Sequence, residues 1–179
     1  MEYQNIGEIY AANDKIREKL IATIGNLTDE QANKLPADEK WTLAALVEHI
    51  GIVEDGMTKI CGKLLAKAQS EDKTADGSAT FSDAFVSGIA GLAERKVEAP
   101  ERVVPTGTQT IAESLAKLEE NRRNLNELRP MFEQFSSSEH TFPHPAFGNL
   151  TACDWLALVG GHEGRHLQQV HRLLEKVNG

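Results

Sequence analysis

Apolar residues recur every three or four positions along four long stretches of this chain, and this spacing restricts its fold more than any other feature. The stretches cover residues 6–27, 43–68, 111–128 and 155–177. A repeat of this kind places one apolar stripe along each α-helix. We find no stretch with the two-residue repeat of a strand, so the sequence predicts an all-α protein.

The connection between the second and third of these helices is long. Residues 69–78 are polar, a shorter apolar pattern over residues 81–92 predicts an extra short helix, and Pro100 and Pro105 end it. A chain of 179 residues suits one domain. We therefore expect residues 1–179 to form a single four-helix bundle, with a long crossover connection that carries an extra short helix between the second and third long helices.

Threonines mark several of the predicted helix starts. Thr28, Thr42 and Thr151 precede helical patterns and are good N-caps. Pro130 should kink or end the third long helix. Residues 136–150 contain prolines, a glycine and serines, and we expect them to form a loop.

Charge and composition exclude several classes of protein. The net charge of −8 gives no basic surface for nucleic acid, so no nucleic-acid partner is expected. No stretch approaches the roughly 18 uninterrupted apolar residues that span a membrane. The first residues show no signal-peptide pattern and the two cysteines lie far apart, which indicates a cytoplasmic protein with reduced, buried thiols at Cys61 and Cys153.

Three histidines occupy positions where the stripes demand apolar residues. His162 and His166 lie four residues apart on the last helix, and His49 falls on the stripe of the second. Histidines at i and i+4 project from one face of a helix, so their ring nitrogens can bind a single cation. The pattern predicts a divalent-metal site of His49, His162 and His166 between the two helices.

Residues 162–166 also match the HExxH motif of zinc proteases, in which Glu163 would act as general base. The match is short, and Gln169 and Arg172 stand where the extended form of the motif has glycine and histidine. A protease would also bind its substrate along a strand edge, and no strand is predicted. We therefore rank proteolysis last.

Residues 41–50 (WTLAALVEHI) and 144–169 (HPAFGNLTACDWLALVGGHEGRHLQQ) resemble the DinB-like metal-binding helical bundles, the superfamily that includes the YfiT-type thiol transferases. The resemblance implies a divalent metal held by three histidines, which match His49, His162 and His166 here. It also implies frequent homodimers and no DNA polymerase activity. Members range from enzymes that use low-molecular-weight thiols to proteins without a known substrate.

Other polar residues support weaker functional predictions. Glu163 could act as an acid or base beside the metal, or could be solvated or support the metal ligands, and Arg165 could bind a carboxylate of the substrate or form a surface ion pair. Asn121 or Arg122 interrupts the stripe of the third long helix and could line the pocket, but an exposed edge is the simpler explanation. The roles of two further histidines, His140 and His144, stay open.

Three neutral imidazoles leave a coordination position open, which is typical of a catalytic metal site. The sequence therefore predicts a metal-dependent enzyme, either a thiol S-transferase or a hydrolase, that acts on a small molecule such as a low-molecular-weight thiol. Zinc, nickel and iron all suit the ligands. The alternative is a non-catalytic metal-binding bundle, and a cleft beside the histidines would favour the enzyme.

Overall fold

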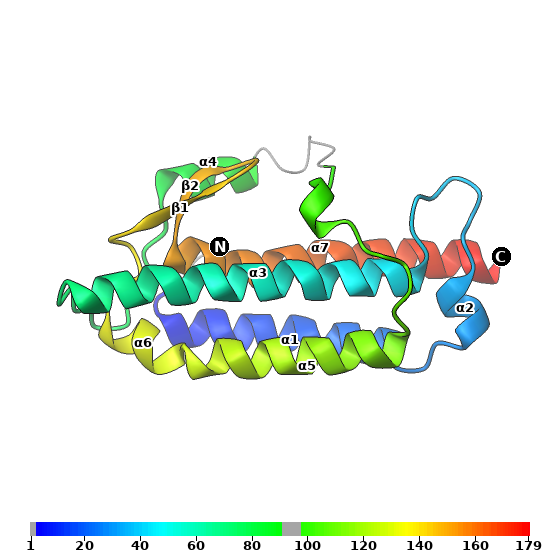
Figure 1. The fold of residues 1–179 in the computed structure, drawn as a ribbon, viewed down its shortest axis with the longest axis horizontal. Coiled ribbons are helices and arrows are strands. Elements are labelled where there is room, and N and C mark those ends of the chain that lie inside the picture. The colour runs from blue at the N-terminus through cyan, green and yellow to red at the C-terminus, as the bar shows by residue number, and fades with distance from the viewer. Residues whose placement is uncertain (1–2, 91–97) are drawn as a thin grey trace.

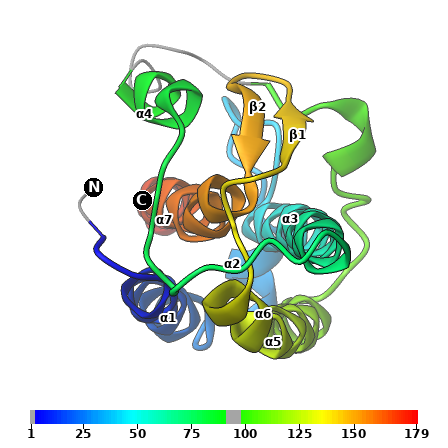
Figure 2. The same cartoon turned by 90° about the vertical axis from the view of Figure 1, so that its left-hand side faces the viewer.

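The long helices of the molecule run side by side as a bundle (Figure 1). The structure, a computed structural model, describes residues 3–90 and 98–179. The bundle consists of α1 (Ile6–Ile24), α3 (Leu43–Ser70), α5 (Ile111–Glu127) and α7 (Ala152–Asn178), and α7 packs against α1 and α3 while α3 also packs against α5 (Figure 2). The predicted four-helix bundle is confirmed. In the part of the chain that the structure describes, no helix has the length and apolar character needed to cross a membrane.

The predicted capping residues lie directly before the first residues of their helices. Thr28 caps the short α2 (Asp29–Asn33), and the side chains of Thr42 and Thr151 accept hydrogen bonds from the backbone at the starts of α3 and α7. Pro130 lies in the first turn of α6 (Arg129–Gln134), just after α5 ends. Local capping chemistry therefore sets where these helices begin, as expected.

The crossover connection between α3 and α5 passes over one side of the bundle (Figure 2). It contains the predicted short helix, α4 (Asp83–Ala90), although residues 91 and 92 of that pattern lie outside the described residues. A turn of 3₁₀ helix, η2 (Glu101–Val103), follows. We call residues 98–107 the strap.

The sequence predicted a loop for residues 136–150, and this prediction is only partly correct. These residues contain β1 (Thr141–His144), which pairs antiparallel with β2 (Gly148–Thr151) in a small hairpin. The strands have four residues each, and β1 is exposed or half-buried throughout, so neither could show the alternating pattern of a half-buried strand. Gly148 adopts a φ of 75°, a conformation that glycine tolerates, at the start of β2.

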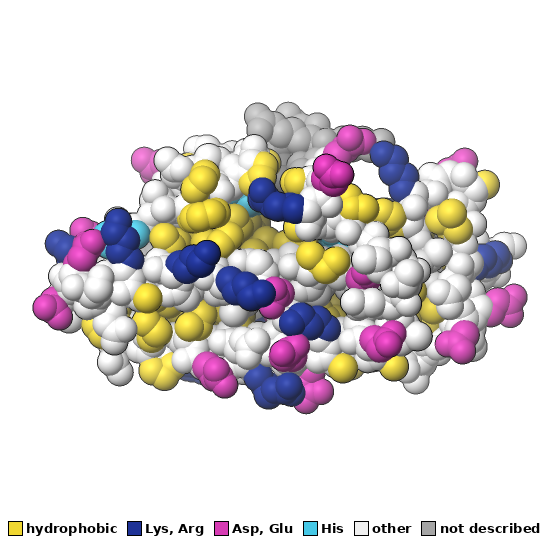
Figure 3. Space-filling view, viewed as in Figure 1, with side chains coloured by type: hydrophobic (Ala, Val, Ile, Leu, Met, Phe, Trp, Pro, Cys, Tyr) yellow, Lys and Arg dark blue, Asp and Glu magenta, His cyan; other side chains and the backbone are white. Residues whose placement is uncertain are grey.

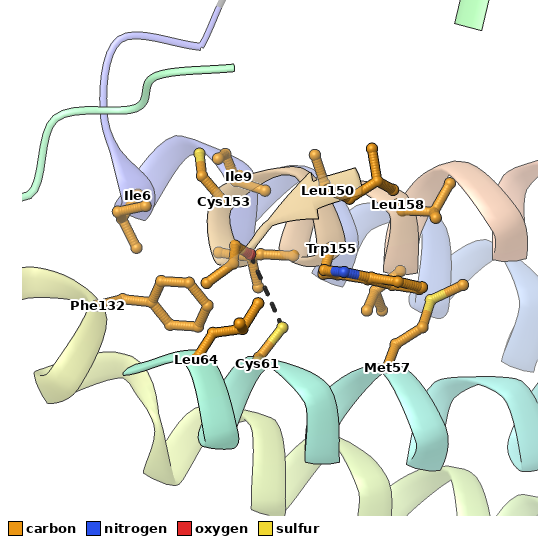
Figure 4. Packing of buried hydrophobic residues seen from close by; sticks show 14 of the residues in the cluster. Ile6, Ile9, Met57, Cys61, Leu64, Phe132, Leu150, Cys153, Trp155 and Leu158 are labelled. Atoms are coloured by element: carbon orange, nitrogen blue, oxygen red, sulfur yellow. Dashed lines mark hydrogen bonds between the residues drawn. The ribbon is translucent and has the colours of Figure 1, made fainter. Parts of the chain in front are cut away.

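Apolar side chains fill the end of the bundle beneath this hairpin (Figure 4). Both cysteines belong to this core, and the thiol of Cys61 donates to the carbonyl oxygen of Ala152 at 3.8 Å. Burial raises the pKa of Cys153 to about 11 and that of Cys61 further. The prediction that both cysteines are buried is confirmed.

Candidate metal centre

The three predicted histidines meet between α3 and α7. His49 lies on α3 and His162 and His166 on α7, and one ring nitrogen from each lies within 4.8 Å of the other two. The Nε2 atoms of His162 and His166 are 3.1 Å apart. Two nitrogens bound tetrahedrally to one zinc ion, each at ~2.0–2.1 Å, would be about 3.3 Å apart. The spacing of the His162 and His166 nitrogens therefore fits a small divalent cation, and a nitrogen of His49 lies within 4.8 Å of both.

Hydrogen bonds fix the proton positions on two of these rings. His49 Nδ1 donates to the carbonyl oxygen of Val103 at 2.7 Å, and His166 Nδ1 donates to the side-chain oxygen of Gln169 at 3.0 Å. A neutral imidazole with its proton on Nδ1 has a lone pair on Nε2. Partners of this kind orient histidine ligands in metal sites.

Burial keeps the three rings neutral. It lowers the pKa of His49, lowers that of His166 to about 4, and lowers that of His162 well below its usual value. The neighbouring imidazoles and the charge of Arg165 lower the pKa of His162 further. Neutral rings are the form that binds metal.

The residue before His49 anchors the strap to α3. Glu48 is buried, and one carboxylate oxygen accepts hydrogen bonds from the backbone N–H and hydroxyl of Thr106 at 2.8 and 2.7 Å. The other oxygen accepts from the backbone N–H of Gly107 at 2.9 Å. His49 donates a hydrogen bond to Val103, which also belongs to the strap. Two consecutive residues of α3, Glu48 and His49, therefore bind the strap at two places.

A cavity of about 660 Å³ opens beside the histidines. Trp41 lines it and contacts His49, with ring centroids 4.8 Å apart and ring planes inclined by 42°. Figure 3 shows hydrophobic side chains gathered in the hollow between the hairpin and the strap, with Lys and Arg side chains at its edge. The residues that line the cavity include Val53, Met57, Ile60, Arg102, His144, Trp155 and Arg165.

The two predicted catalytic residues differ in where they lie. Arg165 lines the cavity and has no carboxylate partner among the described residues, so the surface ion pair is not seen there. Glu163 does not line the cavity, and it is only 1% exposed. Glu163 is therefore buried and not solvated, and a role as an acid or base, or as a support for the metal ligands, stays a prediction.

Glu163 instead belongs to a group of buried charges that we call the charge cluster. Arg17 donates to Glu163 through Nε at 2.6 Å and to Glu54 through Nη2 at 2.6 Å. Arg122 Nη2 lies 3.5 Å from a carboxylate oxygen of each glutamate. The cluster takes one residue from each long helix: Arg17 from α1, Glu54 from α3, Arg122 from α5 and Glu163 from α7.

The sequence analysis missed this cluster. Asn121 and Arg122 are buried, so the exposed edge predicted for them is wrong. Asn121 donates to the carbonyl oxygen of Gly51 at 2.8 Å, and Arg122 pairs with Asp14 at 2.7 Å as well as facing the cluster. Charges of opposite sign close to the apolar stripes of several helices were the signal that could have revealed it.

The two histidines without an assigned role lie in different surroundings. His144 lines the cavity, where its ring centroid is 5.2 Å from that of Trp155, and Ala146 N donates to its Nδ1 at 3.1 Å. His140 Nε2 lies 3.1 Å from a carboxylate oxygen of Glu71, away from the cavity. His144 therefore joins the candidate site and His140 does not.

Fold and site together define a helical bundle with a cluster of three histidines at a cavity. The family model described as the DinB superfamily matches residues 12–170, and the chain belongs to this superfamily. The uncharacterized protein YuaE of Bacillus subtilis (strain 168) is 24% identical over 157 residues, which cover 84% of this chain and 88% of that protein. The crystal structure of TT2238, a four-helix bundle protein, matches with a TM-score of 0.61 at 20% identity, covering 93% of this chain and 98% of that one. This structural likeness supports the fold.

Proposed function

We propose that the protein is a metal-dependent enzyme, a thiol S-transferase or a hydrolase, with His49, His162 and His166 as the ligands of one divalent cation. One observation carries the proposal: the three imidazoles converge at the wall of a cavity of about 660 Å³. A structural metal site is normally closed by a fourth protein ligand, whereas a catalytic one keeps a position for substrate.

The residues of the chain prepare the site for this chemistry. The carbonyl oxygen of Val103 and the side chain of Gln169 hold protons on Nδ1 of His49 and His166, which leaves Nε2 available. When bound, a divalent cation supplies Lewis acidity, which favours the deprotonated form of a thiol or water beside it at neutral pH. Zinc, nickel and iron remain candidates.

The alternative is a non-catalytic bundle in which the metal stabilises the fold or a binding surface. Such a role needs no space next to the ligands. The cavity, with aromatic and apolar walls and an arginine from α7, is typical of a small-molecule site and supports the enzyme.

Metal content in purified variants tests the ligand set. We expect His49→Ala and His162→Ala to lower the zinc content at least several-fold, because each removes one of three donors. His171→Ala is the matched control, since His171 is an exposed histidine on the same helix. If His49→Ala kept a full equivalent of zinc while His162→Ala lost it, the site would be the local HExxH pair and not the three-histidine set.

Activity is tested by screening electrophiles with small thiols, and esters or amides without them, using the zinc-loaded protein. We expect chelation to abolish any activity found and readdition of zinc to restore it. Glu163→Gln should keep a measurable part of the activity if the variant remains folded by circular dichroism. A folded Glu163→Gln protein as inactive as His166→Ala would instead identify Glu163 as a general base.

A two-fold homodimer is part of the same proposal, because the family resemblance and the wide apolar stripes both favour packing between bundles. Light scattering at micromolar concentration measures the mass. A mass near that of the 19.7 kDa chain at all concentrations would contradict the dimer.

A further inference from the structure

Two arginines of the cavity lining are not paired with a carboxylate of the described residues. They are Arg102 on the strap and Arg165 on α7. Asp38 is the remaining carboxylate of the described lining without an ion pair, and it is exposed. Of the other charged residues of the lining, Lys40 pairs with Glu98 at 3.2 Å, and Glu39 pairs at 2.5 Å with Lys176, which lies outside the lining.

The inner wall adds no negative charge to offset the two arginines. It consists largely of histidine, aromatic and aliphatic side chains. Arg165 precedes His166 on α7 and lines the same cavity as His162 and His166. Three cationic and three acidic residues line the cavity, so its formal charge is balanced, but Arg102 and Arg165 are the cationic ones without an ion pair among the described residues. A bound divalent cation would add positive charge to the same wall.

An apolar wall extends away from the histidines. Val53, Met57 and Ile60 follow His49 along α3, and Trp155 faces the cavity from α7. His49 and Ile60 are eleven residues apart, which corresponds to roughly 16 Å along a helix. A ligand that filled this groove would bury a hydrocarbon or aromatic segment as well as a charged group.

We propose that the cavity binds a small molecule with a carboxylate, held by Arg165 and Arg102, and an apolar body that lies against Met57, Ile60 and Trp155. A guanidinium group offers a planar pair of donors that matches the two oxygens of a carboxylate. This inference rests on the proposed function, since it names the substrate class of the same site.

Calorimetry with three probes tests both halves of the ligand. We expect zinc-loaded protein to bind 4-phenylbutyrate more tightly than its neutral amide, which lacks the charge, and more tightly than acetate, which lacks the apolar body. Arg165→Gln and Arg102→Gln should each weaken the binding of 4-phenylbutyrate about tenfold, as expected for a lost charge-assisted hydrogen bond. Arg123→Gln is the control, because Arg123 is an exposed arginine of α5 outside the cavity.

The same titrations on chelator-treated protein separate this inference from the proposed metal chemistry. Loss of binding in the arginine variants with and without zinc supports the inference, even if no enzymatic activity is ever found. Binding that disappears on chelation but is unchanged in Arg165→Gln and Arg102→Gln would mean that the carboxylate binds only the metal, and would overturn it. Equal binding of the amide, or of acetate, would overturn it as well.

Discussion

The histidine cluster, formed by His49, His162 and His166, and the charge cluster both place polar groups between helices, but only the charge cluster balances its charges within the chain. Two arginines there face two glutamates, and Arg17 donates to both carboxylates. In the histidine cluster three rings meet, no carboxylate of the described residues lies among them, and the Nε2 atoms of His162 and His166 are 3.1 Å apart. The first cluster sets two positive charges against two negative ones, whereas the second offers nitrogen ligands that, in our proposal, bind a cation from outside.

Two neighbouring residues show how sharply these roles are divided. His162 faces the cavity, while Glu163, the next residue of α7, bonds to Arg17 of α1. Successive residues of a helix point about 100° apart, so α7 can present ligands on one side and a structural anchor on another. The charge cluster should therefore govern stability, and the histidine cluster metal binding.

The largest expected effect comes from removing the centre of the charge cluster. Arg17→Met would leave two glutamates buried with only the more distant Arg122, and breaking a buried ion pair in this way costs about 3–5 kcal/mol. Chemical denaturation followed by circular dichroism measures the loss. Arg123→Met, which removes an exposed pair with Glu119, should cost less than about 1 kcal/mol. A similar small loss in Arg17→Met would show that the cluster does not hold the helices together.

Metal should stabilise the protein only through the histidine cluster. At a free zinc concentration 100 times the dissociation constant, binding to the native state adds about 2.7 kcal/mol to the free energy of unfolding. Denaturation with and without zinc measures this gain, which should vanish in His49→Ala and persist in His171→Ala. An equal gain in His49→Ala would place the bound zinc elsewhere.

The contrast between the clusters also explains what the sequence could reveal. The convergence of His49, His162 and His166 was predictable because helical periodicity identifies the face of each histidine within its own helix. Arg17 and Glu163 are 146 residues apart in the sequence. A charged residue at the margin of an apolar stripe can be buried or can face solvent, and the sequence pattern is the same in both cases. Their pairing could therefore not be inferred. The hairpin and the conformation of the strap could not be predicted for another reason. Short irregular segments are fixed by tertiary contacts, such as those between Glu48 and the strap, which no local sequence pattern reveals.

Acid should destabilise the metal-free protein through the histidine cluster. The pKa of His166 is lowered from 6.5 to about 4, so between these values the unfolded chain binds a proton that the folded chain does not. Stability from this residue is therefore present above pH 6.5 and is lost as the pH falls toward 4, amounting to about 2 kcal/mol between pH 7 and 5. Denaturation of chelator-treated protein at both pH values, compared with His166→Phe, measures it. An identical pH dependence in the variant would assign the acid sensitivity to other groups.

The smallest predicted effect links the strap to metal affinity. Glu48→Gln keeps the shape of the side chain but removes the charge that accepts three hydrogen bonds from Thr106 and Gly107. A looser strap would hold the carbonyl oxygen of Val103 less firmly against His49 Nδ1, and loss of such outer partners typically weakens metal binding 10–100-fold. Because Glu48 acts through the backbone, we expect the low end, about tenfold, in a competition titration with a zinc chelator. Glu113→Gln is the control, since it removes the charge of a capping side chain at the start of α5 without touching the strap. Were both variants to bind zinc as tightly as the wild type, Glu48 would anchor the strap without positioning His49.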